Sequence, residues 1–572
     1  MRRYRFVLLA FISIAGLVPL QNLTAADVPD EQFSLFDTWS TDHPADKGDQ
    51  TVGAWFNDFG FNAVASSSLL VDESNAGQVI CSSIDACPKA TKFWAVSMLH
   101  FCSDLNEVNC IVAAFAQNPS GKKIDYTNRR YIPADQEKVF PGDPDYRLPQ
   151  GSTPSLGNFQ GIKNLGGNEN YTVAAYLIQR FTITDRGKKS FQASDPLFLA
   201  NITGVNLETG NYSPRKILQK EAVYGNPSID YEYSVKNNEC VILDNNLCGK
   251  PVALPSDVSF GLRLRMNTQF YGWFHGRLSN ASFTQLSTTD KYSEFEISGQ
   301  GSKVPSALAK TTLSQISDAE WAGLIGGSKP SPTNYGSKNY PPYLAVVASV
   351  RGTYMMNSFN LMQKYINEKA ISMPTFWSVR NVESGQVINS SGQKALDCLY
   401  KFEGNKGKIL GFVNTNSTAY TSGPPTFNEA EGALEYRVAA PHFAKDGSEF
   451  KGMYSLQINS DVARCMFGTI GSAVKATVTV VNKDGQSSVS TATVNESNGM
   501  FKFLAAGFTF SSPTIRLKLE NSPAVTPTTT PSPTASVAKP LVEIKKISCT
   551  KGKTVKTVSG VNPKCPAGFK KK

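Results

Sequence analysis

Alternation of apolar and polar residues is the dominant pattern along the chain. The clearest run covers 258–266, where apolar residues occupy every second position and serine or arginine occupies positions 259, 263 and 265. A period of two is typical of a half-buried antiparallel strand. Similar runs predict further strands at 94–102, 173–183, 270–274, 292–297, 474–480 and 514–519.

Two central segments depart from this period and predict short helices. Ser317-Asp318-Ala319-Glu320 is a capping box, with Trp321 and Leu324 on the apolar side of the turn that follows. From 354 to 370, apolar residues recur at helical spacing, which predicts a helix of about four turns. We therefore predict a mainly β fold of multidomain antiparallel β-sandwiches with two or more short helices in the central part.

Chain length and turn composition suggest the organisation. Between 117 and 168 the chain is rich in Gly, Pro, Asn and charge, so we expect long surface loops there. A chain of this length is too long to fold around a single hydrophobic core, so we expect three globular domains. The predicted order is a signal peptide at 1–26, an N-terminal β-rich domain at 27–215, a central β-rich domain with helices at 216–395, a C-terminal β-sandwich at 396–520, a Pro/Thr-rich linker at 521–540 and a basic tail module at 541–572.

The N-terminus has the pattern of a secretory signal. Arg2, Arg3 and Arg5 precede an apolar stretch at 6–20, and Thr24-Ala25-Ala26 offers small residues for a signal peptidase. The apolar stretch is shorter than the roughly 18 residues expected of a membrane span, and no later segment reaches that length. We expect a secreted or cell-surface protein with no transmembrane segment in the mature chain.

The ten cysteines form an even set, which outside the cytoplasm predicts disulfides. Local pairing predicts Cys240–Cys248 and Cys549–Cys565, with Cys398–Cys465 as a longer link. The first four allow three connectivities, of which we prefer the local one. It joins Cys81 to Cys87 and Cys102 to Cys110. Zinc is disfavoured because no CxxC pair is present and no histidine is spaced to complete a tetrahedral site.

Positive charge is concentrated at the C-terminus. Ten lysines and one acid, Glu543, lie between 539 and 572, which gives this segment a charge of +9 out of a total of +10. The three arginines of the predicted signal contribute another +3, so the body from 27 to 538 carries only −2, and nothing indicates a nucleic-acid-binding body. The candidate anion-binding residues are Lys545, Lys546, Lys551, Lys553, Lys556, Lys564, Lys570, Lys571 and Lys572.

A disulfide between Cys549 and Cys565 would constrain a segment that is too small to have its own core. Lysines projecting from such a loop favour a salt-sensitive contact with an anionic wall polymer or membrane surface. The alternative is a solubility or sorting tag with no ligand. Pro523, Pro527, Pro531, Pro533 and Pro540 among threonines predict an extended spacer before the tail.

Two regions carry a resemblance to known sequences. The tail, from Ile547-Ser548-Cys549 to Cys565-Pro566-Ala567-Gly568-Phe569, resembles a short C-terminal module of exported actinobacterial proteins. Ser460–Cys465, Phe508–Ile515 and Gly272–Arg277 are similar to a large uncharacterised secreted family of the same bacteria. The resemblance implies a Gram-positive-type envelope or secreted location, and it implies no activity.

Catalytic signatures are sparse. No HExxH motif, GxSxG elbow, P-loop or dinucleotide fingerprint is present, and we assign no catalytic, cofactor-binding or metal-binding residue and expect no cofactor. The four histidines, 43, 100, 275 and 442, are best interpreted as structural or surface residues. The acids at 42, 46 and 49 lack EF-hand spacing and are interpreted as solvated. Trp273 and Phe274 are interpreted as core residues on opposite faces of a strand, with sugar stacking as the alternative.

Two functional hypotheses follow. The favoured one is an exported cell-envelope or secreted protein with a binding or structural role, tethered non-covalently to anionic envelope polymers by its basic tail. The alternative is an extracellular glycan-active hydrolase that uses a carboxylate pair, for which Glu294 with Glu296 and Asp143 with Asp145 are the candidates. A solute-capturing lipoprotein is disfavoured because no lipobox cysteine follows the signal.

Overall fold

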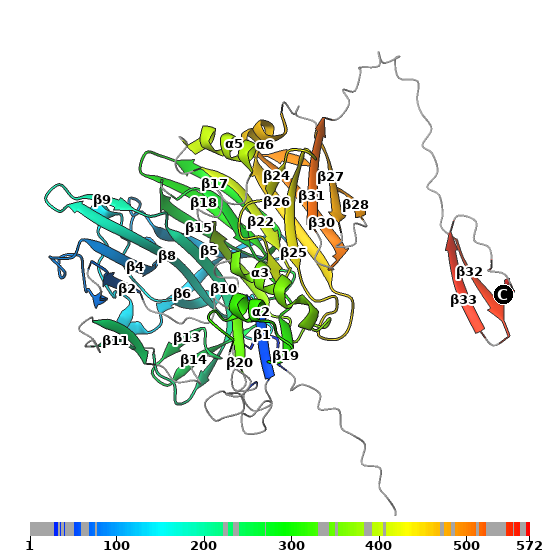
Figure 1. The fold of residues 1–572 in the computed structure, drawn as a ribbon, viewed down its shortest axis with the longest axis horizontal. Helices are drawn as coiled ribbons and strands as arrows, with labels where there is room; N and C mark the ends of the chain where they lie inside the picture. Colours follow the sequence, from blue (N-terminus) through cyan, green and yellow to red (C-terminus); the bar gives the residue numbers. More distant parts are fainter. Residues whose placement is uncertain are drawn as a thin grey trace, which may run out of the picture. The chain divides into compact units, whose positions relative to one another are not determined.

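The computed structural model of the protein divides into two compact units, Met1–Ser522 and Pro523–Lys572 (Figure 1). It describes residues 28–571 apart from 33–34, 36–38, 40–50, 59–67, 75–76, 215, 221–226, 233–238, 269, 330–342, 349–352, 383–391, 404–407, 469–473, 482–486, 493, 511–513, 522–544, 553, 561–564 and 566–567. The predicted signal peptide and nearly all of the predicted linker therefore lie outside the described residues.

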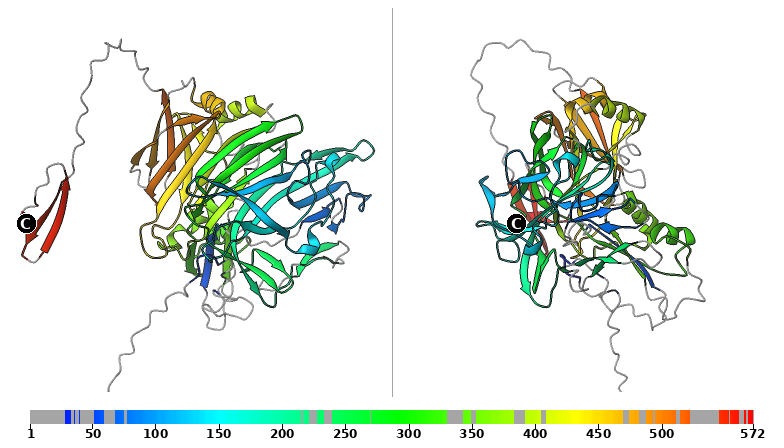
Figure 2. Two further views of the ribbon diagram at one scale, coloured as in Figure 1. Left: turned by 180° about the vertical axis from the view of Figure 1, so that it is seen from behind. Right: turned by 90° about the vertical axis from the view of Figure 1, so that its left-hand side faces the viewer.

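An eight-stranded antiparallel barrel forms the centre of the main unit (Figures 1 and 2). Each strand pairs with the next, and the last pairs with the first, which closes the sheet. In this cyclic order the strands are β5 (Cys110–Gln117), β6 (Lys123–Tyr131), β7 (Ser155–Phe159), β8 (Asn170–Asp185), β10 (Leu197–Thr209), β21 (Thr375–Asn381), β18 (Tyr292–Lys303) and β15 (Ser259–Asn267).

The barrel interior is filled by large apolar side chains. On β15, the predicted apolar set Phe260, Leu262 and Leu264 is fully buried in one core cluster, as its period of two requires. Trp377 on β21 belongs to the same cluster, and its indole N–H donates to the carbonyl oxygens of Phe260 and Gly299 at 3.0 Å each. The mainly β prediction and the strand predicted at 258–266 are thus confirmed.

Further strands extend the barrel sheet on both sides. The strands β4 (Lys92–Met98) and β9 (Ser190–Ala193) pair with β8, and β2 (Leu69–Asp72) pairs with β4 and with β3 (Val79–Ile80). The strands β14 (Leu247–Val252) and β13 (Ile242–Asp244) continue from β10, and β17 (Leu278–Thr288) pairs with β18. A separate hairpin contains β11 (Lys216–Lys220) and β12 (Ser228–Glu232).

A β-sandwich follows in the C-terminal part of the main unit. One sheet contains β16 (Gly272–Gly276), β22 (Ile409–Thr415), β26 (Lys451–Asn459), β30 (Met500–Thr509) and β29 (Asn495–Ser497). The other contains β23 (Ala419–Tyr420), β24 (Thr426–Asn428), β25 (Ala433–Ala439), β31 (Thr514–Asn521), β27 (Val474–Val481) and β28 (Ser487–Ala492). Both contribute to one core cluster, as the predicted sandwich requires.

Helices cover two edges of these layers. The helices α5 (Gln393–Glu403) and α6 (Ser460–Phe467) pack together beside the sandwich. The helices α2 (Asp318–Leu324) and α3 (Thr353–Met362) share a core with β19 (Ala307–Thr312), β1 (Thr51–Asn57) and β20 (Tyr343–Ala348). The predicted capping box is confirmed, since Ser317 and Glu320 bond reciprocally. Among the described residues, every helix is too short or too polar to span a bilayer.

Two predictions about local structure are wrong. The helix predicted from 354 to 370 ends at Met362 and continues as a 3₁₀ turn over Gln363–Tyr365, because Ile366 is extended and bridges to Ala309. The segment 117–168 contains β6 and β7 and two 3₁₀ turns, Ala134–Gln136 and Pro144–Tyr146. On β6 only Tyr126 is fully buried, so this barrel strand lacks the apolar alternation that identifies the others.

The predicted domain boundaries at 215 and 395 fall inside the main unit. The strands β10 and β21 pair directly, as do β16 and β22, so hydrogen-bonded sheets connect residues on both sides of each boundary. The three-domain division itself remains a prediction.

Candidate functional site

The candidate site is a buried polar junction where the barrel, the sandwich and the β1 sheet meet. Arg277 follows β16 directly, Asp58 follows β1, and Arg380 lies on β21. All three charged side chains are almost completely buried. Burial of three ionised groups is costly unless they are paired and hydrogen-bonded, so the partners of each decide what the junction does.

Arg277 ties together three separate parts of the fold. Its Nε donates to Oδ2 of Asp58 in a buried ion pair. Its Nη1 donates to the carbonyl oxygens of Thr415 and Ser417, at 2.8 and 2.7 Å, and its Nη2 donates to the carbonyl oxygen of Thr418 at 3.4 Å. One guanidinium thus fixes the end of β1 and the connection between β22 and β23.

The contact with Arg380 determines which ring nitrogen of His275 carries the proton. Its Nη2 lies 3.2 Å from Nδ1 of His275, and an arginine can only donate, so Nδ1 accepts. The other ring nitrogen, Nε2, lies 3.0 Å from the carbonyl oxygen of Gly423, to which it must donate. His275 is therefore neutral. Burial is the main cause that lowers its pKa well below the usual value, and the charges of Arg380 and Arg277 lower it further.

Two tyrosines complete the junction. Tyr420 accepts a hydrogen bond from Nε of Arg380 at 3.1 Å, and the Arg277 guanidinium lies 4.4 Å from the centre of its ring. Tyr436 donates to the carbonyl oxygen of Thr421 at 2.6 Å. Burial raises the pKa of Tyr436 well above its usual value, so its hydroxyl stays protonated.

A cavity of about 10 Å³ lies in the junction, lined by Asp58, His275, Gly276, Arg277, Ser378, Val379, Arg380 and Tyr420. This is roughly the space of one water molecule. The junction can therefore hold the sheets together, but its cavity is too small for a sugar or a peptide.

The histidines flagged by the sequence lie apart from one another or outside the described residues, as His43 does. His100 is buried, and its Nε2 lies 2.6 Å from Oε1 of Glu107. His442 is half-buried. Within the described ranges, no three His, Cys, Asp or Glu side chains are close enough to hold a metal ion. The acids at 42, 46 and 49 lie outside those ranges.

The acids of the candidate carboxylate pairs form ion pairs with basic side chains or accept hydrogen bonds from the backbone. Glu294 is buried between Arg263 and Arg265, and Glu296 pairs with Lys123 at 2.9 Å. Asp143 caps the 3₁₀ turn Pro144–Tyr146 by accepting from the N–H of Asp145.

Asp145 itself pairs with Lys189. These contacts favour a structural interpretation of all four acids. The core interpretation of Trp273 and Phe274 is confirmed, because both are at most 1% exposed and neither is available to stack on a sugar.

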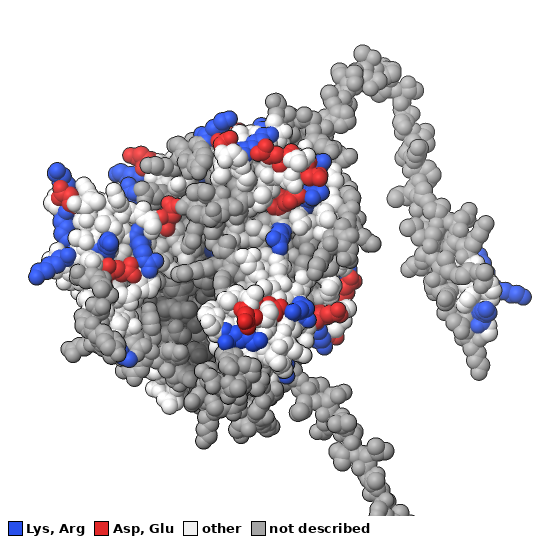
Figure 3. Space-filling view, viewed as in Figure 1, with Lys and Arg blue, Asp and Glu red and all other residues white. Residues whose placement is uncertain are grey.

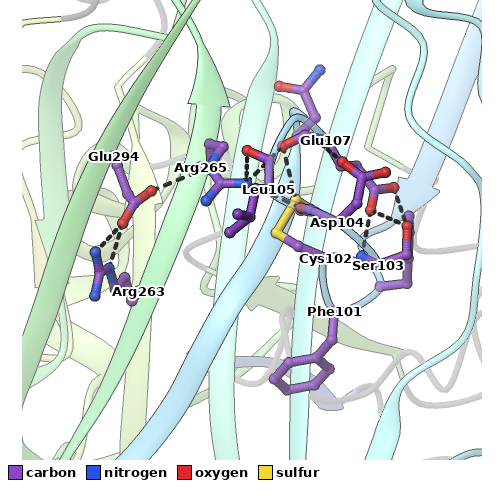
Figure 4. The surroundings of a disulfide bond; sticks show 12 residues. Phe101, Cys102, Ser103, Asp104, Leu105, Glu107, Arg263, Arg265 and Glu294 are labelled. Atoms are coloured by element: carbon purple, nitrogen blue, oxygen red, sulfur yellow. Dashed lines mark hydrogen bonds and ion pairs between the residues drawn. A yellow bond between two sulfur atoms is a disulfide. The ribbon is translucent and has the colours of Figure 1, made fainter. Parts of the chain in front are cut away.

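A disulfide-closed loop between Cys102 and Cys110 lies beside the buried acid Glu294 (Figure 4). Nη1 of Arg265 donates to the carbonyl oxygens of Asp104, Leu105 and Glu107, at 3.3, 2.9 and 3.3 Å. Leu105 is 83% exposed, so the loop presents an apolar side chain from a cross-linked base.

The cysteines form five disulfides, with none free among the described residues. The pairs are those that local spacing predicts: Cys81–Cys87, Cys102–Cys110, Cys240–Cys248, Cys398–Cys465 and Cys549–Cys565. Five disulfides are consistent with an extracellular, oxidising environment.

The C-terminal unit is a small sheet of β32 (Lys545–Lys551), β33 (Thr554–Gly560) and β34 (Lys570–Lys571). Cys549 is buried, and its register partner on β34 is Lys571. The described lysine side chains, those of Lys551, Lys570 and Lys571, are all exposed. The side chains of Lys545, Lys546, Lys553, Lys556, Lys564 and Lys572 lie outside the described residues.

Charge is distributed differently in the two units. On the visible face of the main unit, positive and negative side chains are intermixed, while the described part of the C-terminal unit shows positive ones only (Figure 3). The sequence explains this difference, since residues 545–572 contain no acid.

Sequence reasoning found the disulfides and the basic tail but missed the buried junction. The available signal was Gly272-Trp273-Phe274-His275-Gly276-Arg277, where a histidine and an arginine adjoin a strand too apolar to face water. Asp58 gave no signal, because a lone acid at a strand end is usually solvated.

Comparisons with known proteins assign no family. No family model matches the chain, and no curated protein matches it. A search of solved structures found a variant of oxalate decarboxylase from B. subtilis, at 11% identity over 60% of this chain and 72% of that chain, with a TM-score of 0.08. So slight a likeness carries no argument, and the site must be interpreted from its own residues.

Proposed function

We propose that this is an exported cell-envelope or secreted protein with a binding or structural role, tethered by its C-terminal unit to an anionic envelope polymer. The observation that carries the proposal is the separation of the chain into a large unit and a small disulfide-closed one with exposed lysines. The resemblance of both parts to exported actinobacterial proteins supports a Gram-positive-type envelope as the location.

The physical basis of the tether is a set of like charges without a compensating acid. Lys551, Lys570 and Lys571 are exposed, and the backbone around them is fixed by strand pairing and by the disulfide. A preorganised cationic surface loses less conformational freedom on binding than a flexible one. Its attraction to a polyanion is long-ranged at low salt and screened to about 3 Å at 1 M salt.

Binding of the mature protein to isolated bacterial cell walls tests the tether. We expect the full mature chain to sediment with the walls at 50 mM salt. At 1 M salt the amount of protein that sediments should fall on the order of tenfold, because screening removes the attraction. A variant in which Lys551, Lys570 and Lys571 are replaced by Gln should remain in the supernatant.

A charge-matched control separates the tail from general basicity. Replacement of three exposed lysines of the main unit, Lys89, Lys122 and Lys188, by Gln lowers the net charge equally and should leave wall binding unchanged. Equal loss of binding in both triple variants, or retention that is insensitive to salt, would contradict the tether.

A further inference from the structure

The buried junction contains one carboxylate and two guanidiniums among the described residues. Only one of the two carboxylate oxygens accepts a hydrogen bond there. Oδ2 of Asp58 accepts from Arg277, while Oδ1 is buried and has no hydrogen-bond partner within the described ranges. A buried carboxylate oxygen without a donor costs about 1–3 kcal/mol or more. A donor is therefore expected beside it.

Arg380 is the second group that can form further hydrogen bonds. Its Nε donates to Tyr420 and its Nη2 to His275, which accounts for two of the five N–H groups of a guanidinium. Arg380 is buried, and it lines the same cavity as Asp58.

We propose that this cavity is a binding site for one water molecule, which donates to Oδ1 of Asp58 and accepts from the guanidinium of Arg380. Its volume of about 10 Å³ matches one water. The single carboxylate then serves both arginines, Arg277 by direct contact and Arg380 through the water. The proposal is independent of the tail and of the proposed function.

The lining residues select water over an ion. A halide would be attracted by the two guanidiniums, but it would lie against the free oxygen of Asp58, which repels an anion and would stay without a donor. A metal cation would face two arginines and only one carboxylate. A neutral molecule that both donates and accepts gives Oδ1 of Asp58 a donor and the guanidinium of Arg380 a further acceptor.

A crystal structure of the mature protein grown with 0.5 M sodium bromide distinguishes these occupants. We expect a density peak within hydrogen-bond distance of Asp58 Oδ1 and of the Arg380 guanidinium, with no anomalous signal at the bromine edge. An anomalous peak there would overturn the proposal in favour of a halide. A cavity without density would overturn it as well.

A conservative variant provides an independent measurement. Ser378→Thr adds one methyl group to the lining and keeps the hydroxyl. Oxygen-17 relaxation dispersion counts long-lived internal waters in solution, and the variant should hold one fewer per molecule than the parent. An unchanged count, in a variant whose crystal structure shows the methyl group inside the cavity, would refute the assignment.

Discussion

Asp58 and Arg277 form a buried ion pair although they lie 219 positions apart in the sequence. Each lies one residue beyond the end of a strand, Asp58 after β1 and Arg277 after β16. Because Arg277 also binds three carbonyl oxygens of residues 415–418, the pair joins elements from three regions of the chain.

The first prediction concerns the removal of this arginine. Arg277→Met should lower the free energy of unfolding by about 3–5 kcal/mol, because it leaves Asp58 buried without its partner. Urea unfolding followed by tryptophan fluorescence measures this loss. Arg180→Met is the matched control, since Arg180 pairs with Glu73 at the surface and its loss should cost about 1 kcal/mol or less. Equal losses in the two variants would contradict the assigned role.

The junction also shows where prediction from sequence ends. A period of two identifies which residues of 258–266 face a core, but it does not say which strands are neighbours. The closure of the barrel depends on the pairing of β21 with β10 and β18, across nearly 180 residues in the first case. A buried Asp58 is recognisable only once Arg277 is placed beside it.

Features formed by residues close together in the sequence were predicted more reliably than pairings between distant strands. The capping box at Ser317 and the short disulfide loops are satisfied by residues within a few positions of each other, so the sequence contains the whole interaction. The end of α3 was missed because Ile366 pairs with Ala309, a distant partner, in place of continuing the helix.

The second prediction concerns acid sensitivity through His275. The pKa of this histidine is lowered in the folded protein by burial, while in the unfolded chain it stays near 6.5. The unfolded state therefore binds the proton more tightly, and the contribution of His275 to stability is lost as the pH falls below 6.5. The melting temperature of His275→Gln should depend less steeply on pH between 5 and 6.5 than that of the parent. His442→Gln, at a half-buried position, is the control for the general effect of replacing a histidine by glutamine.

The third prediction concerns Glu31, whose contribution to stability is lost as the pH rises and not as it falls. Near the N-terminus of the described chain, Asp30 and Glu31 accept the backbone N–H groups of Met373 and Thr375 at 2.9 and 3.0 Å. Burial is the main cause that raises the pKa of Glu31 to about 8. The folded state therefore holds this proton more tightly than the unfolded state, in which the pKa is near 4.5, and stability is lost as the pH rises from 4.5 towards 8.

Glu31→Gln tests this assignment directly, because the amide oxygen can still accept from Thr375 without carrying a charge. We expect the variant to be more stable than the parent at pH 8 and equal to it at pH 4.5, as measured by thermal unfolding. A stability difference that is the same at both pH values would show that Glu31 does not titrate in this range.

The fourth prediction concerns the loop from Cys102 to Cys110. Its three carbonyl oxygens meet at Nη1 of Arg265, and Glu107 accepts from the N–H and the hydroxyl of Ser103 (Figure 4). Arg265→Met removes the donor that holds the carbonyls, so amide hydrogen exchange at 103–109 should accelerate by about tenfold or more, the equivalent of one to two lost hydrogen bonds.

Arg263→Met is the control that makes this result specific. Both arginines pair with Glu294, so each variant leaves that acid with one partner, but only Arg265 contacts the loop. Exchange at 103–109 should therefore stay at the parental rate in Arg263→Met. If both variants accelerate exchange equally, the loop responds to Glu294 and not to the arginine at its carbonyls. If neither does, the loop is held by its other contacts, which include the disulfide and the bonds between Ser103 and Glu107.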